Sequence, residues 1–259
     1  MQIQLDIKNL SKQFGGVDAL KNVDIYVGYG EILSIIGPNG AGKTTFFNLV
    51  TGFYPPDNGD ILLEGKNLSG LPPHKFTKAG IARTFQNIRL FPWMTVRDNL
   101  IVACQMKCSG GLLGACFRTS LVKREEEKTL QKVDRILSFF ELKGKENLQA
   151  KNLAYGEQRR LEIARALALE PRLLLLDEPT AGMNASESEE CVETIFSINE
   201  ELEITIILIE HDMNVVMDIS DRIVVLDYGL KIAEGIPEEI QKNENVIKAY
   251  LGDDYFGKS

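Results

Sequence analysis

The sequence lacks an apolar run long enough to cross a membrane, and its first residues lack the features of a secretory leader. A spanning helix needs about 18 consecutive apolar residues, whereas the longest apolar runs, near residues 173–176 and 204–209, have the length of strands. Residues 1–6 have neither a basic head nor an apolar stretch. We therefore expect a cytosolic chain.

Positive charge is also scarce. Lys and Arg total 29 against 37 for Asp and Glu, which gives a net charge of -8. Such a surface repels phosphate backbones unless a local basic patch intervenes, and basic runs are no longer than pairs such as Arg159-Arg160. We expect no nucleic-acid partner, and we interpret these two arginines as lining a solvated or interface face of a helix.

Residues that commonly bind structural metals are few and badly spaced. The only histidines are His74 and His211. None of the cysteine spacings is CxxC, so we expect free thiols in a reducing compartment; the cysteines are Cys104, Cys108, Cys116 and Cys191. We place His74 in a loop, because it follows Pro72 and Pro73, and assign it no role.

What the chain does contain is the pattern of an α/β protein. Its 259 residues, 44% of them hydrophobic, suffice for a sizeable core. Alternation at residues 3–7 and 23–27 predicts an N-terminal antiparallel layer of short strands. Helices and strands then alternate, which predicts a mainly parallel sheet. We expect strands at residues 32–36, 60–64, 81–85, 173–176, 204–209 and 222–226, and helices at residues 43–50, 157–169, 186–202, 213–219 and 246–251.

The pattern changes between about residues 91 and 151. Apolar positions recur with helical spacing over residues 122–140, after a break at residues 109–111. We interpret this region as an inserted helical subdomain. The expected organisation is a single domain, 1–259, with an α/β core and β layer (1–90 and 162–235), a helical subdomain (91–161) and a helical tail (236–259).

A glycine-rich segment follows the apolar strand at residues 32–36. It matches GxxxxGK[ST] and lies between a strand and a helix, the context in which this motif binds phosphates. Its backbone N–H groups would point at phosphate oxygens, Lys43 would reach the β- and γ-phosphates, and Thr44 would bind Mg²⁺. The candidate nucleotide-binding residues are Gly37, Pro38, Asn39, Gly40, Ala41, Gly42, Lys43, Thr44 and Thr45.

A second motif ends the apolar strand at residues 173–176. Asp177 and Glu178 follow it directly. In a P-loop ATPase the first acid completes the Mg²⁺ shell and the second polarises the attacking water. An acidic turn after a strand is common by itself, but the upstream phosphate loop makes the catalytic interpretation the better one.

With these motifs the sequence resembles the ATP-binding cassette (ABC) transporter ATPases over nearly its whole length. Residues 152–160 stand where that family has its signature motif, and residues 181–184 stand at its D-loop. The resemblance implies that Gln86 contacts Mg²⁺, that His211 contacts the γ-phosphate, and that Phe14 stacks on adenine.

Two residues depart from the family pattern. Ala154 replaces the signature serine, so backbone N–H groups around Gly156 must contact the opposing γ-phosphate. Asn184 replaces the D-loop aspartate. Both resemble the subfamily for uptake of branched-chain and hydrophobic amino acids, as do residues 219–223, 233–235 and 246–252.

The resemblance implies an ATP-hydrolysing subunit of an importer on the cytoplasmic face of the cell membrane. ATP and Mg²⁺ are the implied cofactors, with Thr44, Gln86 and Asp177 at the metal and Glu178, Gln86 and His211 in catalysis. The implied partners are a second ATPase subunit, identical or paralogous, transmembrane permeases and, indirectly, a substrate-binding protein. Residues 91–94 would be either core or the dock for a permease helix.

Four other functions fit the sequence less well. A soluble ABC ATPase of DNA repair or chromosome structure would need long heptad insertions, which are lacking. A P-loop GTPase would need an Asn-Lys-x-Asp tetrad, also lacking. A non-catalytic nucleotide-binding regulator is disfavoured by the presence of Glu178 and His211. Within transporters, a lipid or lipopolysaccharide exporter is the remaining alternative.

Overall fold

A computed structural model of the chain describes residues 2–106 and 120–251, and the side chains of all of these except residues 120–123. Cys108, Cys116 and the break expected at residues 109–111 lie outside the described ranges. Within these ranges, none of the helices combines the length and the apolarity that crossing a bilayer demands.

Four strands form an antiparallel sheet in the order β2-β1-β4-β5. They are β1 (Ile3–Phe14), β2 (Val17–Gly28), β4 (Asn58–Leu63) and β5 (Lys66–Asn67). The predicted antiparallel layer is confirmed, but β1 and β2 have 12 residues each and are longer than expected. Register shifts between Ile7 and Leu10 explain the difference, because an extra residue restores the inward direction of apolar side chains after the alternation breaks.

A second sheet has the order β10-β9-β3-β8-β7-β6. Its strands are β3 (Ile32–Ile36), β6 (Ile81–Arg83), β7 (Leu173–Asp177), β8 (Thr205–Ile209), β9 (Arg222–Asp227) and β10 (Leu230–Gly235). All of its pairings are parallel except that of β9 with β10. The predicted mainly parallel sheet is confirmed; β10, partly exposed at the edge, was not predicted.

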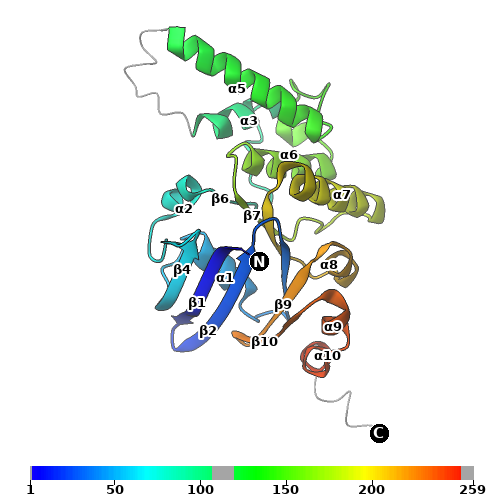
Figure 1. Cartoon of the computed structure of the whole chain (residues 1–259). Coiled ribbons are helices and arrows are strands. Elements are labelled where there is room, and N and C mark those ends of the chain that lie inside the picture. Colours follow the sequence, from blue (N-terminus) through cyan, green and yellow to red (C-terminus); the bar gives the residue numbers. More distant parts are fainter. Residues whose placement is uncertain (1, 107–119, 252–259) are drawn as a thin grey trace.

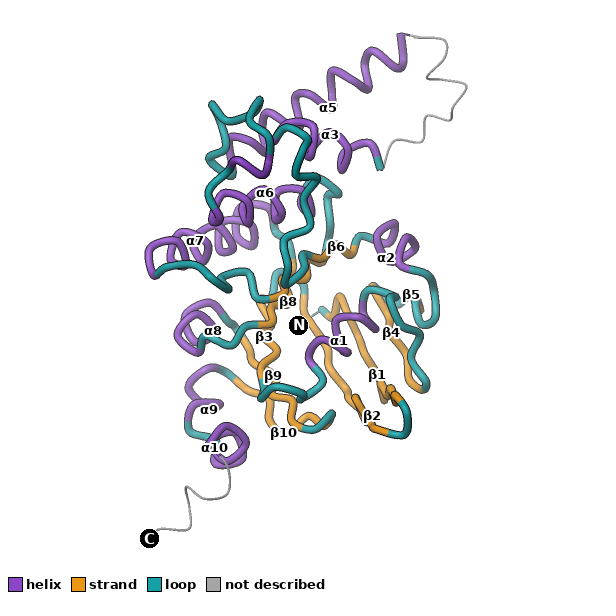
Figure 2. The backbone as a smooth tube through the Cα atoms, turned by 180° about the vertical axis from the view of Figure 1, so that it is seen from behind, coloured by secondary structure: helices purple, strands orange, loops and turns teal. Residues whose placement is uncertain are grey.

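Most of the helices lie around this sheet, whereas α3 and α5 lie beyond α6 at one end of the molecule (Figures 1 and 2). They are α1 (Lys43–Val50), α2 (Pro73–Ala79), α3 (Val96–Gln105), α5 (Ser120–Phe139), η1 (Ala150–Asn152), α6 (Tyr155–Leu167), α7 (Ala185–Leu202), α8 (Met213–Ile219), α9 (Pro237–Gln241) and α10 (Glu244–Leu251). The loop placement of His74 is wrong: it lies in α2, which starts at Pro73 and ends against Gly80 in the left-handed conformation. Proline at a helix start and glycine just past its end are the usual signals.

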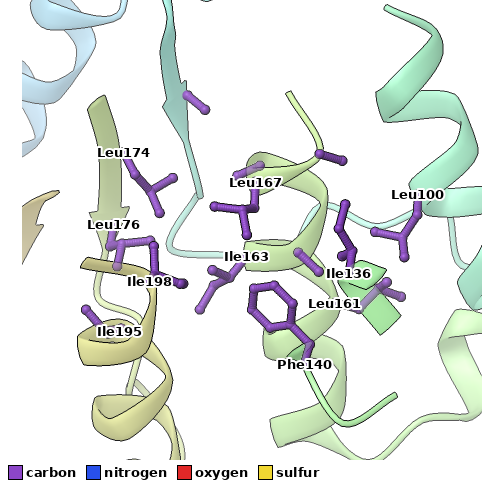
Figure 3. Packing of buried hydrophobic residues seen from close by; sticks show 14 of the residues in the cluster. Leu100, Ile136, Phe140, Leu161, Ile163, Leu167, Leu174, Leu176, Ile195 and Ile198 are labelled. Atoms are coloured by element: carbon purple, nitrogen blue, oxygen red, sulfur yellow. The ribbon is translucent and has the colours of Figure 1, made fainter. Parts of the chain in front are cut away.

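The two faces of β7 contribute to different hydrophobic clusters, as its alternating side chains require. Leu174 and Leu176 belong to a cluster that also contains residues of α3, α5, α6 and α7, part of which is shown in Figure 3. Leu173 and Leu175 pack in the cluster that also contains Phe46 of α1 and residues of the antiparallel sheet. The sheet is therefore covered on both sides, and the polar residues gather at the ends of its strands.

Candidate nucleotide-binding site

The glycine-rich loop joins β3 to α1 at the carboxyl end of the sheet, where ligands bind in open α/β folds. Gly42 precedes the helix at φ 106°, and a Cβ there would lie 2.5 Å from the Ala19 carbonyl oxygen. At Gly37 a Cβ would lie 2.0 Å from the Leu226 carbonyl oxygen. Neither position has room for a side chain, so close packing requires both glycines.

Lys43 folds back over this loop. Its Nζ donates to the carbonyl oxygens of Gly37, at 2.6 Å, and Pro38, at 3.0 Å. Burial lowers the pKa of Lys43, while the charges of Glu178 and Asp177 raise it. The amine is thus held by neutral carbonyl oxygens near the two acids. A phosphate can replace these acceptors, because a hydrogen bond between two charged groups is stronger.

Glu178 has the positive φ of 47°, and its backbone N–H donates to the Ile209 carbonyl oxygen at 2.8 Å. This bond ties the end of β7 to the end of β8. Gln86 Nε2 donates to Glu178 Oε2 at 2.9 Å, and His211 Nδ1 lies 3.9 Å from the same oxygen. Of the three residues expected in catalysis, Gln86 and His211 therefore converge on the carboxylate of the third, Glu178.

The buried carboxylate of Glu210 holds the backbone of His211 in place. Glu210 is 1% exposed and accepts hydrogen bonds from the backbone N–H and the hydroxyl of Thr180, at 2.9 and 2.6 Å. The backbone N–H of His211 donates to the other oxygen of Glu210 at 3.1 Å. Glu210 thus fixes the backbone of His211 to the turn that follows Glu178, while the imidazole remains largely exposed.

Three side chains of α6 hold the segment around Gln86. Arg159 donates to the carbonyl oxygens of Phe85 and Gln86, at 2.8 and 2.9 Å. Glu162 accepts from the backbone N–H of Arg89 at 3.0 Å, and Arg165 donates to the Arg89 carbonyl oxygen. We call Arg159, Glu162 and Arg165 the α6 clamp; it fixes the loop bearing Gln86 to the helix that begins at the signature residues.

The expectation that Arg159 lies on a solvated or interface face is wrong. Its side chain is 0% exposed and pairs with Glu162 at 2.9 Å, and the partners from the Gln86 loop replace water. Arg160 does lie near the surface, beside Glu190 and Glu141.

The signature and D-loop residues lie at the starts of two neighbouring helices, α6 and α7. A Cβ on Gly156 would lie 3.3 Å from Glu187 Oε1, and the Tyr155 hydroxyl donates to the Ala181 carbonyl oxygen at 2.9 Å. Asn184 caps α7 by accepting from the Glu187 N–H at 3.1 Å. An aspartate would also cap this helix, so the departure at residue 184 preserves the local structure.

Phe14 lies at the end of β1, 42% exposed. Its ring meets that of Tyr54 edge-on at 5.3 Å, and Lys12 Nζ lies 5.6 Å from its centre. An exposed ring held at its edge can stack on a base. Its role at adenine stays a prediction.

Two residues near the site were missed at the sequence level. Arg83 pairs with Asp177 at 2.7 Å. Burial raises the pKa of Tyr250 of α10, against a smaller lowering effect of a hydrogen bond from the Gly37 backbone. Arg83 lies three residues before Gln86, but its contact depends on which strand neighbours β6; Tyr250 showed no local signal.

Replacing Lys43 with Ala should weaken ATP binding about 10- to 100-fold, because a contact between an ammonium and phosphate contributes about 1.5–3 kcal/mol. The fold should persist, since the Lys43 amine contacts loop carbonyls and no core residue. ATP titration and far-UV circular dichroism should be measured together. Unchanged affinity in the folded variant contradicts the phosphate-loop assignment.

Comparison with known proteins identifies the family. The family model described as "ABC transporter" matches residues 20–181. The chain belongs to this family. A second model, described as "Branched-chain amino acid ATP-binding cassette transporter", matches residues 231–255, a range that contains most of β10 and all of α9 and α10. The prediction of the family from its ordered motifs is confirmed.

Curated relatives match almost the whole chain. This chain is 47% identical over 249 residues to the high-affinity branched-chain amino acid transport ATP-binding protein LivG of Escherichia coli. The match covers 96% of this chain and 98% of LivG. The chain is 45% identical to BraF of Pseudomonas aeruginosa, a protein of the same description, with the same coverage.

Solved structures show the same fold. A nucleotide-free ATP-binding cassette from an ABC transporter is 30% identical, with a TM-score of 0.85, covering 97% of this chain and all of that one. A dimeric cassette in a post-hydrolysis state with ADP and Pi is 28% identical, with a TM-score of 0.75, covering 90% and 98%. The predicted fold class is confirmed.

Proposed function

We propose that the chain is the ATP-hydrolysing subunit of an ABC importer for branched-chain or hydrophobic amino acids, peripheral at the cytoplasmic face of the membrane. The observation that carries this proposal is the match over 98% of LivG together with the match of residues 231–255 to the branched-chain cassette model. The convergence of Gln86 and His211 on Glu178 supports a hydrolytic role.

The residues present fit Mg²⁺ and ATP. Thr44 lies in the first turn of α1, where backbone N–H groups lack intrahelical acceptors and favour phosphate. The hydroxyl of Thr44, the amide oxygen of Gln86 and the carboxylate of Asp177 are the oxygen ligands that Mg²⁺ takes, alongside water and phosphate. When bound, the ion would neutralise charge on the phosphates.

Hydrolysis then needs a water aligned with the γ-phosphate and a base to receive its proton. Glu178 supplies the carboxylate, held in direction by the bond between its backbone and Ile209. Lys43 would contact the β- and γ-phosphates, and His211 would contact the γ-phosphate. The water proton passes to Glu178 as the bond from water oxygen to phosphorus forms and the bond to ADP breaks.

The signature residues lie at the start of α6, whereas Lys43 lies at the start of α1 (Figure 1). In our proposal a second ATPase subunit, identical or paralogous, places its Gly156 region over this chain's ATP. The dimeric ADP and Pi structure of a cassette sharing this fold supports that arrangement. A single copy alone should hydrolyse ATP poorly.

The segment after Gln86 is the proposed dock for a permease helix. Phe91, Trp93 and Met94 are 41%, 72% and 40% exposed, so the interpretation of these residues as core is wrong. Lys151 Nζ lies 3.2 Å from the centre of the Trp93 ring. An exposed apolar cluster next to the α6 clamp suits a partner that must respond to the Gln86 loop.

Trp93 should report nucleotide-linked motion of this segment. It is the only tryptophan in the chain, and a small shift relative to the Lys151 ammonium changes its surroundings. We expect different emission with Mg-ATP and with ADP. Identical emission, with binding of both shown independently, contradicts the coupling of this segment to the site.

Uptake of labelled leucine tests the whole proposal. The chain should restore uptake to Escherichia coli cells lacking LivG, and the Lys43→Ala variant, at equal abundance, should not. An exporter subunit would leave uptake absent in both. If the chain does not assemble with those permeases, co-expression with the permeases of its own source separates poor assembly from a different function.

A further inference from the structure

The buried pair of Arg83 and Asp177 lies next to the proposed magnesium ligands. The strands β6 and β7 are parallel neighbours, and Arg83 is in register with Leu175. The guanidinium therefore reaches the end of β7, where its Nη2 lies 2.7 Å from Asp177 Oδ2. Both side chains are only 7% exposed, so solvent screens this contact little.

Groups of α1 and of the loop after β6 fix the guanidinium. Nη1 donates to Asn48 Oδ1 of α1 at 2.7 Å. The centres of the Phe47 and Phe85 rings lie 5.3 and 5.1 Å from its Cζ, within the range of cation–π attraction. Arg83 is thus bound to the helix that begins with Lys43 and packed against the residue preceding Gln86.

We propose that Arg83 is a positioning residue for the magnesium site, one that holds Asp177 by Oδ2 and leaves Oδ1 for a metal-bound water. This inference rests on the proposed function, because it takes Asp177 as a residue of that site. Asp177 ends its strand, and its carboxylate can rotate; the rigid, planar Arg83 group fixes that rotation. Partners of this kind typically contribute about 10- to 100-fold to metal affinity.

A guanidinium can act on a metal site in two opposing ways. Its charge repels Mg²⁺, so removing it could tighten metal binding; its hydrogen bond orients the carboxylate, so removing it could weaken binding. The additional contacts to Asn48 and the two rings favour orientation, because they immobilise the group. The sign of the effect in a charge-removing variant therefore decides between them.

The experiment is a Mg²⁺ titration of the binding of ATP carrying a fluorescent N-methylanthraniloyl group, compared with binding in EDTA. In Arg83→Met we expect the Mg²⁺ concentration at half-maximal ATP binding to rise about 10- to 100-fold. The affinity for ATP in EDTA should be unchanged. Arg83→Lys should fall between this variant and the wild type. Asn48→Ala, which removes a support of Arg83 without touching Asp177, should shift the dependence in the same direction.

Arg97→Met is the matched control, since it breaks the partly exposed pair with Asp134 and should leave the titration unchanged. Should Arg83→Met be unfolded by circular dichroism, Arg83→Lys and Asn48→Ala decide. The proposal is overturned if the Mg²⁺ concentration at half-maximal binding stays the same or falls. It is also overturned if ATP affinity in EDTA falls by the same factor as affinity in Mg²⁺. Asp177→Asn distinguishes a failure of this inference from a failure of the proposed function. If it too leaves the Mg²⁺ titration unchanged, Asp177 does not act at the magnesium site.

Discussion

Replacing Glu178 with Gln should lower the rate of ATP hydrolysis about 10²- to 10⁴-fold, the usual contribution of a general base. The change is nearly isosteric, and an amide can still accept the hydrogen bond from Gln86 Nε2. Lys43, Thr44 and Asp177 are untouched, so ATP and Mg²⁺ should still bind. Steady-state phosphate release and ATP affinity are the measurements.

With hydrolysis stalled, the ATP-bound dimer should persist long enough for size-exclusion chromatography. A dimer of this chain alone shows that the region of Gly156, despite Ala154, can close over ATP held by an identical copy. A dimer that forms only with a paralogous ATPase indicates a heterodimer. Glu189→Gln, an equivalent change on the exposed side of α7, is the control. A wild-type rate in Glu178→Gln rules out the mechanism given above.

Replacing Arg159 with Met should destabilise the protein by about 3–5 kcal/mol, the typical cost of removing one partner of a buried ion pair. Burial already raises the pKa of Glu162, against the lowering effects of the Arg89 N–H and of Arg159. Without Arg159 that carboxylate is left buried without its cation, and two carbonyl oxygens of the Gln86 loop lose their donor. Urea unfolding gives the change in free energy.

Two further variants identify the cause. Arg159→Met combined with Glu162→Leu should regain part of the lost stability, because it removes the uncompensated charge. Arg160→Met, next in sequence but paired with the exposed Glu190 and Glu141, should cost less than about 1 kcal/mol. Equal losses for the Arg159 and Arg160 variants would show that the α6 clamp does not stabilise the fold as described.

How far the sequence predicted the structure depended on how local each signal was. The strand before the phosphate loop and the helix after it have the predicted bounds, β3 (Ile32–Ile36) and α1 (Lys43–Val50), because an apolar run, glycines and a helical pattern lie in adjacent residues. The helix α9 (Pro237–Gln241) has only five residues and no helical repeat that periodicity could reveal.

In the candidate site too, residues in short local motifs could be predicted, whereas contacts between distant segments could not. Gln86, Glu178 and His211 were found because each stands in a short motif, and the structure brings them together. The burial of Arg159 and its hold on the Gln86 loop depend on how α6 packs beside a segment about 70 residues away. The contact of Arg83 with Asp177 depends likewise on the order of the strands, so neither could be read from spacing alone.

The position of β3 in its sheet also affects how the chain is made. Its neighbours on both sides are β8 and β9, and Ile32 pairs with Ile206. A ribosome adding about 5–20 residues per second takes on the order of 10–35 s to cover that interval. During this time the strand that carries the phosphate loop has emerged with both edges unpaired, which is a hazard for aggregation. The nascent chain should therefore depend on chaperones until residues beyond 227 are synthesised, and a truncation before β8 should aggregate.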